Sequence, residues 1–193
     1  MGNTNKVNRK KKIATLCRVL RKVSYFFPQH ALLKFYYAHI HSQLQYVIIA
    51  WGRACKSKLA KLQVLQNRCL KLIYGLPPLH PTLELYGNRN HNMLPILGLC
   101  KLQTLLLVHD ILHNEKTHSN LAINTGNRSR STRQAGSLAV IRTYTNQGQK
   151  QFSYIGPSKF NALSKELKGI ANRSQFKFKV KLHLKSKINE FLI

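Results

Sequence analysis

Acidic residues are scarce in this chain. Asp and Glu together number 5, against 32 Lys and Arg in 193 residues, and Asp110 is the one aspartate. Two-metal polymerases and nucleases hold a pair of divalent ions about 3.5–4 Å apart between clustered carboxylates. A single aspartate cannot build such a cluster of Asp carboxylates, so we expect no catalytic two-metal centre within this chain.

Paired cysteine motifs are absent. The 4 cysteines are irregularly spaced, and none lies in the C-x-x-C arrangement of zinc ribbons and redox motifs. Residues 1–12 are polar and end in the basic run Arg9–Lys12, whereas a secretory signal needs an apolar stretch. We expect reduced thiols, no cofactor, and an intracellular location in the nucleus or cytoplasm rather than secretion.

Long apolar runs are absent as well. Lys101 and Gln103 interrupt the best candidate, so no run reaches the roughly 18 residues that a membrane span requires. With 44% apolar residues, however, a chain of this length can bury roughly 70% of the surface that it exposes when unfolded. We therefore expect a folded body without a membrane span.

The surplus of positive charge predicts a polyanionic partner. The formal net charge is +27, and such a charge repels itself in the folded state. The phosphates of a nucleic acid would relieve that repulsion and release their counterions. We expect binding to RNA, DNA or both through phosphate contacts. A basic structural protein of a ribonucleoprotein particle would have the same composition, so that alternative stays open.

The spacing of apolar residues predicts a mainly α-helical fold. Apolar residues recur at intervals of three and four, and Gly and Pro mark the ends of the periodic segments. Helices are expected at about 13–25, 29–51, 57–73, 81–86, 99–113, 157–168 and 174–191, and two short strands at 138–145 and 152–155 form a small β-hairpin. The regions are a basic N-terminal tail (1–12), a helical domain (13–113), a flexible polar loop (114–136) and a C-terminal hairpin with helices (137–193).

An ordered series of landmarks carries a family resemblance. It begins with Tyr36, His39, His41, Leu44, Tyr46, Trp51-Gly52, Leu59, Lys61-Leu62, Leu65–Arg68 and Ile73. It continues with His80–Thr82, Leu94–Leu97, Leu112–Asn114, Thr132-Arg133, Arg142-Thr143, Gly156-Pro157, Asn161, Leu163 and Phe176-Lys177. In this order the landmarks resemble the region that follows the palm in reverse transcriptases of non-LTR (LINE-type, jockey-like) retrotransposons. The resemblance covers about residues 13–193.

The resemblance implies a thumb-like helical bundle in 13–113 that grips template and primer. The fingers and the palm, with its catalytic aspartates, would lie upstream of Met1, so we expect a truncated fragment that is inactive alone. A palm domain supplied by another chain would be a partner, and the uncovered palm-facing surface predicts self-association. Phe160 and Ser164 stand where the family usually has Trp and Pro. A decayed fragment without a selected function is a further alternative.

Three groups of cations are candidates for phosphate contact. The first lies on the helix expected at 57–73 and comprises Lys58, Lys61, Arg68 and Lys71, within an arc away from the leucine stripe. The second is Arg18, Arg21 and Lys22 together with Arg9–Lys12, and the third is Arg128, Arg130 and Arg133 in the polar loop. A helix of ~18 residues is about 27 Å long, enough to follow several phosphates of a duplex. A solvated face is the competing interpretation of each group.

Other patterns suggest different chemistry. His109 and His113 lie four residues apart near Asp110 and His118, a spacing that suits zinc, but no Glu follows His109 as a catalytic base. The final helix has lysines opposite an apolar face, which suits a lid over the core or an anionic membrane surface. Tyr36 and Tyr37 suit either the core or base stacking.

Overall fold

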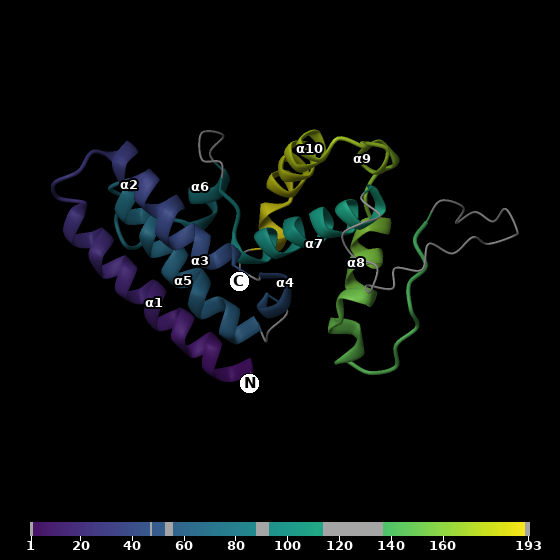
Figure 1. Cartoon of the computed structure of the whole chain (residues 1–193). Coiled ribbons are helices and arrows are strands. Elements are labelled where there is room, and N and C mark those ends of the chain that lie inside the picture. Colours follow the sequence, from purple (N-terminus) through teal and green to yellow (C-terminus); the bar gives the residue numbers. More distant parts are fainter. Residues whose placement is uncertain (1, 47, 53–55, 88–92, 114–136, 192–193) are drawn as a thin grey trace, which may run out of the picture. The chain divides into compact units, whose positions relative to one another are not determined.

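The computed structural model describes residues 2–46, 48–52, 56–87, 93–113 and 137–191 (Figure 1). These residues are mainly helical and include no β-strand. The chain divides into unit 1, which is Met1–Cys100 with Leu184–Ile193, and unit 2, which is Lys101–His183. The expected loop at 114–136 lies outside the described residues.

Unit 1 is built around three long helical segments that lie side by side (Figure 1). Its elements are α1 (Gly2–Val23), α2 (Gln29–Phe35), the π-helix η1 (Tyr36–His41), α3 (Ser42–Gln45), α4 (Ile48–Trp51), α5 (Lys56–Ile73), α6 (Thr82–Gly87), the first residues of α7 (Ile96–His113) and the 3-10 helix η3 (Ile188–Phe191). Helix α1 packs along α5, and α2 contacts both. Because α1 already begins at Gly2, the region expected as a tail is helical.

The apolar stripes of α1 and α5 form the core of unit 1, as the spacing predicts. Ile13, Cys17 and Leu20 follow one another by four and three residues on α1, and all are buried. On α5 the stripe is continued by Leu59, Leu62, Cys69, Leu70 and Ile73. Helix α5 ends at Ile73, and the chain turns away at Gly75, whose φ of 61° is readily adopted by glycine. The amide N–H groups of Gly75 and Leu76 donate to the carbonyls of Leu72 and Lys71.

The segment expected as one helix at 29–51 is interrupted. Helices α2, η1 and α3 continue from Gln29 to Gln45, and the chain then leaves the helix at Tyr46, where ψ is 114°. Tyr36, Ile40 and Leu44 succeed one another by four residues and are each 0% exposed. The backbone break at Tyr46 separates α3 from α4, so the helical register of the first part does not carry into the second.

Two buried glutamines fix the position of α5. The side chain of Gln63 donates to Tyr86 Oη and Asn67 Oδ1 at 2.8 Å each, and its Oε1 accepts the amide N–H of Ile96, the first residue of α7, at 2.8 Å. Gln66 donates to Tyr36 Oη at 3.2 Å and to the carbonyl of Leu94 at 3.0 Å. Buried polar groups with partners on separate elements hold those elements in one arrangement. The network therefore sets which face α5 turns outward.

Unit 2 contradicts the predicted β-hairpin. It contains the rest of α7, the 3-10 helix η2 (Gly148–Lys150), α8 (Phe152–Asn161), α9 (Lys165–Lys168) and most of α10 (Arg173–Ser186). Residues 152–155, expected as a strand, are the first turn of α8, because Phe152, Gly156 and Phe160 are spaced by four and are all buried. Residues 138–145, expected as the other strand, form neither a strand nor a helix.

A side chain takes the place of the missing partner strand. The amide N–H of Leu138 donates to Asn161 Oδ1 at 2.9 Å, and Asn161 Nδ2 donates to the carbonyl of Leu138 at 2.8 Å. This pair satisfies both backbone groups of an extended residue, as a neighbouring strand would. The backbone groups of Leu138 therefore find their partner in a side chain of α8 and not in a β-strand.

The last helix begins one residue before the expected 174, because Asn172 caps it. Asn172 Oδ1 accepts the amide N–H groups of Ser174 at 2.9 Å and Gln175 at 3.2 Å. Asn is among the strongest N-cap residues because its short side chain reaches these free donors. Helix α10 accordingly begins at Arg173.

Helix α7 is more apolar than the sequence interpretation allowed. It is the one helix among the described residues whose length and mean hydropathy would suffice for a membrane span, and 56% of that stretch is buried inside the protein. The core helix of a globular protein passes the same test. Lys101 and Gln103, which lie within it, were the reason to expect no span there.

Candidate nucleic-acid interface

The cations of α5 lie on the side of the helix away from the core. Lys58, Lys61 and Arg68 are exposed, whereas Lys71 is half-buried and its Nζ donates to the carbonyl of Pro78 at 2.6 Å. Lys71 therefore holds the turn after α5. It is the least available of the four candidates for a phosphate.

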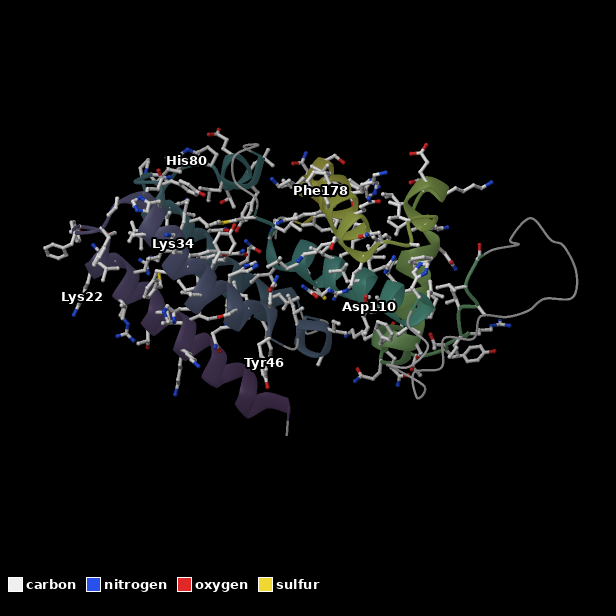
Figure 2. The ribbon with its side chains drawn as sticks, turned by 45° about the horizontal axis from the view of Figure 1, so that its top comes forward. Lys22, Lys34, Tyr46, His80, Asp110 and Phe178 are labelled. Atoms are coloured by element: carbon white, nitrogen blue, oxygen red, sulfur yellow. The ribbon has the colours of Figure 1, made fainter. Side chains whose placement is uncertain are left out.

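The cations of α1 are exposed along one side of that helix. Lys11, Arg18 and Lys22 are exposed and lie seven and four residues apart, so they share a helical face. Arg21 is exposed at the flank of this face. Lys22 extends away from the ribbon near the turn between α1 and α2 (Figure 2). The side chains of Arg9 and Lys10, part of the same candidate group, lie outside the described residues.

The structure brings the first two groups together at the contact between α1 and α5. Helix α1 packs along α5, and Cys17 of α1 accepts a hydrogen bond from the thiol of Cys69 of α5. This hydrogen bond, helped by the positive charges of Arg68 and Arg21, lowers the pKa of Cys17 to about 7, against the opposing effect of burial. One arginine comes from each helix, so both helices contribute positive charge to this part of the surface. We call the exposed residues Arg18, Arg21, Lys22, Lys58, Lys61 and Arg68 the basic face.

Carboxylates do not neutralise this part of the basic face. The ion pairs among the described residues join His80 to Glu84 at 3.4 Å and Arg173 to Asp110 at 2.7 Å. Neither involves Arg21, Lys22 or Arg68. These cations therefore leave a positive potential at the surface that attracts a polyanion.

The remaining predicted cations have different settings. Arg128, Arg130 and Arg133 lie outside the described residues. On α10, Phe176, Val180 and Leu184 are each 0% exposed, while Lys177 and Lys179 are exposed. The apolar face of α10 is thus part of the core, as a lid over the body requires, and is not available to a membrane surface.

The histidine pair proposed for zinc is built into unit 2 in another way. His109 is 1% exposed, its Nε2 lies 2.8 Å from the carbonyl oxygen of Ile170, and its ring stacks on Phe176 at 4.3 Å. The nitrogen facing the carbonyl must carry the proton, which leaves Nδ1 as a buried atom without a hydrogen-bond partner. Asp110 is paired with Arg173, and His118 lies outside the described residues. Within the described ranges no group of three His, Cys, Asp or Glu side chains could hold a metal ion.

The sequence interpretation missed two features: an exposed aromatic turn and a pair of buried glutamines. Tyr25 and Phe26, in the turn after α1, are 77% and 84% exposed, whereas Tyr36, for which the core was one of two expected settings, is 0% exposed. A run of three aromatic residues directly before a proline was the available signal. The buried glutamines of α5 also had a signal, since Gln63 and Gln66 fall on the same helical side as Leu59, Leu62 and Leu70.

Comparison with known proteins adds no relative. No family model, no curated protein and no solved structure matches the chain.

Proposed function

We propose that this protein is a non-catalytic nucleic-acid-binding module that holds RNA or DNA by phosphate contacts. The observation that carries the proposal is the basic face, in which exposed cations lie on two helices, α1 and α5, that pack along each other. A net charge of +27 with 5 acidic residues supplies the long-range attraction. Phosphate contacts position a nucleic acid but read no sequence, so affinity should depend little on sequence.

The landmark series supports a narrower form of the proposal, in which the chain is the thumb and C-terminal region of a retrotransposon reverse transcriptase. Several landmarks have structural roles that suit a folded helical body: Gln66 and Tyr36 are joined in the buried network, and Asn161 holds Leu138. The proposed fragment acts inside the cell, on template and primer, and a palm domain from another chain would supply the polymerase chemistry. Without that palm the fragment extends no primer.

The test compares binding of a labelled duplex by two variants of equal charge. The first, Arg18→Gln/Lys22→Gln/Arg68→Gln, removes cations from the basic face. The second, Lys165→Gln/Lys177→Gln/Lys179→Gln, removes the same charge from exposed positions of unit 2. Each lost phosphate contact lowers the magnitude of the slope of log K against log salt by about 0.9. We expect the slope of the first variant to decrease in magnitude by up to three times this amount, and the slope of the second variant to stay unchanged.

Equal losses in the two variants would show that total charge, not the basic face, determines binding. Binding that requires a ribosomal subunit, with no affinity for a free duplex, would favour the basic ribonucleoprotein component instead.

A further inference from the structure

The turn between α1 and α2 presents aromatic rings to solvent. Tyr25, Phe26 and Phe27 are 77%, 84% and 53% exposed, and we call these residues the aromatic turn. A solvent-exposed phenyl ring forgoes the burial that stabilises such side chains in a core. Adjacent exposed aromatic residues on a charged protein are typical of a binding surface.

The rings are exposed although the backbone that carries them is well held. The amide N–H groups of Phe26 and Phe27 both donate to the carbonyl of Val23, at 3.0 and 3.1 Å. Ser24 Oγ donates to the carbonyl of Arg21 at 2.8 Å, and Pro28 directly precedes the first turn of α2. The aromatic turn is therefore a closed, hydrogen-bonded connection. A rigid platform loses little conformational entropy when a ligand stacks on it.

Cations flank the aromatic turn on both sides in the sequence. Arg21 and Lys22 precede it at the end of α1, and Lys34 follows it on α2, all of them exposed. Lys22 and Lys34 both lie in this part of unit 1 (Figure 2). A ligand at the turn would thus meet aromatic faces and positive charges together.

The arrangement of charge favours a linear polyanion over a membrane surface. Lys11, Arg18 and Lys22 share one face of α1 along about 16 Å of helix, and this line leads to the aromatic turn. A single nucleic-acid strand whose phosphates follow that line would place its next bases at the aromatic turn. A membrane would meet the tip of the turn and leave the cations further along α1 without contact.

We propose that the aromatic turn Tyr25–Phe27 is a stacking site for unpaired bases of single-stranded RNA or DNA, with Arg21 and Lys22 holding the neighbouring phosphates. The inference rests on the proposed function and deepens it, because it assigns a place for a single-stranded segment next to the basic face. Every base has a π-face, so the site accepts any sequence. A base-paired duplex keeps its bases stacked inside and gains nothing at this site.

The experiment uses the full chain and measures the affinity for labelled oligo-dT and for a duplex of equal phosphate number. In the variant Phe26→Leu/Phe27→Leu the side chains stay apolar but lose their rings. Stacking contributes ~1–3 kcal/mol per base, so we expect affinity for oligo-dT to fall by at least about fivefold. Duplex affinity should change by less than about twofold, since it depends on the phosphate contacts.

Two controls separate stacking from other effects. Tyr46→Leu removes a ring that is 66% exposed elsewhere in unit 1 and should leave oligo-dT affinity unchanged. Because both substituted phenylalanines are exposed, the thermal midpoint of the double variant should equal that of the unaltered protein. Vesicles containing phosphatidylserine serve as the alternative ligand.

Each outcome has a distinct meaning. Unchanged oligo-dT affinity in the leucine variant, with duplex binding intact, overturns the stacking site alone. If the leucine variant binds the vesicles more weakly than the unaltered protein does while oligo-dT affinity is unchanged, the turn is a lipid contact instead. If the unaltered protein binds neither nucleic acid, both the stacking site and the proposed function fail.

Discussion

Two thiols that lie far apart in the sequence meet between α1 and α5. Cys17 is 5% exposed and Cys69 is 0% exposed. The hydrogen bond that Cys69 donates, helped by Arg68 and Arg21, lowers the pKa of Cys17 to about 7, and the same hydrogen bond raises the pKa of Cys69. A thiolate beside a protonated thiol is the starting arrangement for disulfide formation.

We predict that mild oxidation with diamide joins Cys17 to Cys69. Diamide accepts the two electrons and two protons that the thiols lose, so the protein mass falls by two hydrogens. The reaction should be faster at pH 8 than at pH 6, because the thiolate of Cys17 forms as the pH rises through about 7. Mass spectrometry of a tryptic digest identifies the joined peptides.

Cys100 provides the control for this prediction, since it is buried and its thiol lies 4.0 Å from the carbonyl of Ile48. Cys100→Ser should leave the product unchanged, and Cys69→Ser should abolish it. A product of the same mass in Cys69→Ser would contradict the assignment.

His109 makes the stability of unit 2 depend on pH. Burial lowers the pKa of His109, and the charge on nearby His113 acts in the same direction, while the carbonyl of Ile170 and the carboxylate of Asp110 oppose them. The neutral ring is therefore favoured in the folded protein. As the pH falls below about 6.5 the unfolded chain takes up a proton that the folded protein does not, so the free energy of unfolding falls.

The pH prediction is tested with His109→Gln. Between pH 7.5 and pH 5.5 the unaltered protein should lose more stability than the variant, because the variant has no titrating ring at 109. The urea midpoint at each pH gives the comparison. His30→Gln, at an exposed position, should retain the full pH dependence of the unaltered protein. An equal pH dependence in His109→Gln would show that another group is responsible.

At the scale of elements, the helices of unit 1 were largely predictable, because helical spacing of apolar residues is a local signal. Helix α6 was expected at 81–86 and occurs at Thr82–Gly87, and α5 begins and ends within one residue of its expected bounds. The hairpin was wrong because the four residues at 152–155, three of them apolar, are too short a window to separate a strand from a helical turn. The burial of Gly156 and Phe160 decides between them.

The candidate site shows the same difference between local signals, which the sequence carries, and tertiary contacts, which it does not. The cations of α1 and α5 were found separately from their helical faces, but local spacing does not indicate that Arg21 and Arg68 both act on Cys17. This shared effect depends on how α1 packs along α5, which is a tertiary property. The roles of Gln63 and Asn161 depend in the same way on partners distant in the sequence.

The buried network of α5 gives a prediction at this scale. Replacing Gln63 by Leu leaves the amide N–H of Ile96 and the hydroxyl of Tyr86 without this partner. Each buried group left unsatisfied costs about 1–3 kcal/mol. We expect Gln63→Leu to lower the free energy of unfolding by at least ~1 kcal/mol, measured by urea denaturation.

Val64 supplies the matched control, since it is the next residue on α5 and is 64% exposed. Val64→Ala should change the free energy of unfolding by less than about 0.5 kcal/mol. If the two variants were equally stable, the network would not be what holds α5.

At the scale of the whole molecule, the main feature is the net positive charge. The net charge of +27 is distributed over a chain with 44% apolar residues, so the protein combines a packed interior with a strongly positive surface. A polyanion that covers this surface removes self-repulsion and should stabilise the fold as it binds. The basic face and the aromatic turn are the places where such a ligand would be held.

The salt dependence of nucleic-acid affinity tests the central claim most directly. Affinity for a short DNA duplex is measured by fluorescence anisotropy over a series of salt concentrations. Each phosphate contacted contributes about −0.9 to the slope of log K against log salt, so contact by several residues of the basic face predicts a slope of roughly −3 or steeper. Affinity should also change little when the duplex sequence is scrambled. A slope near zero would contradict the account.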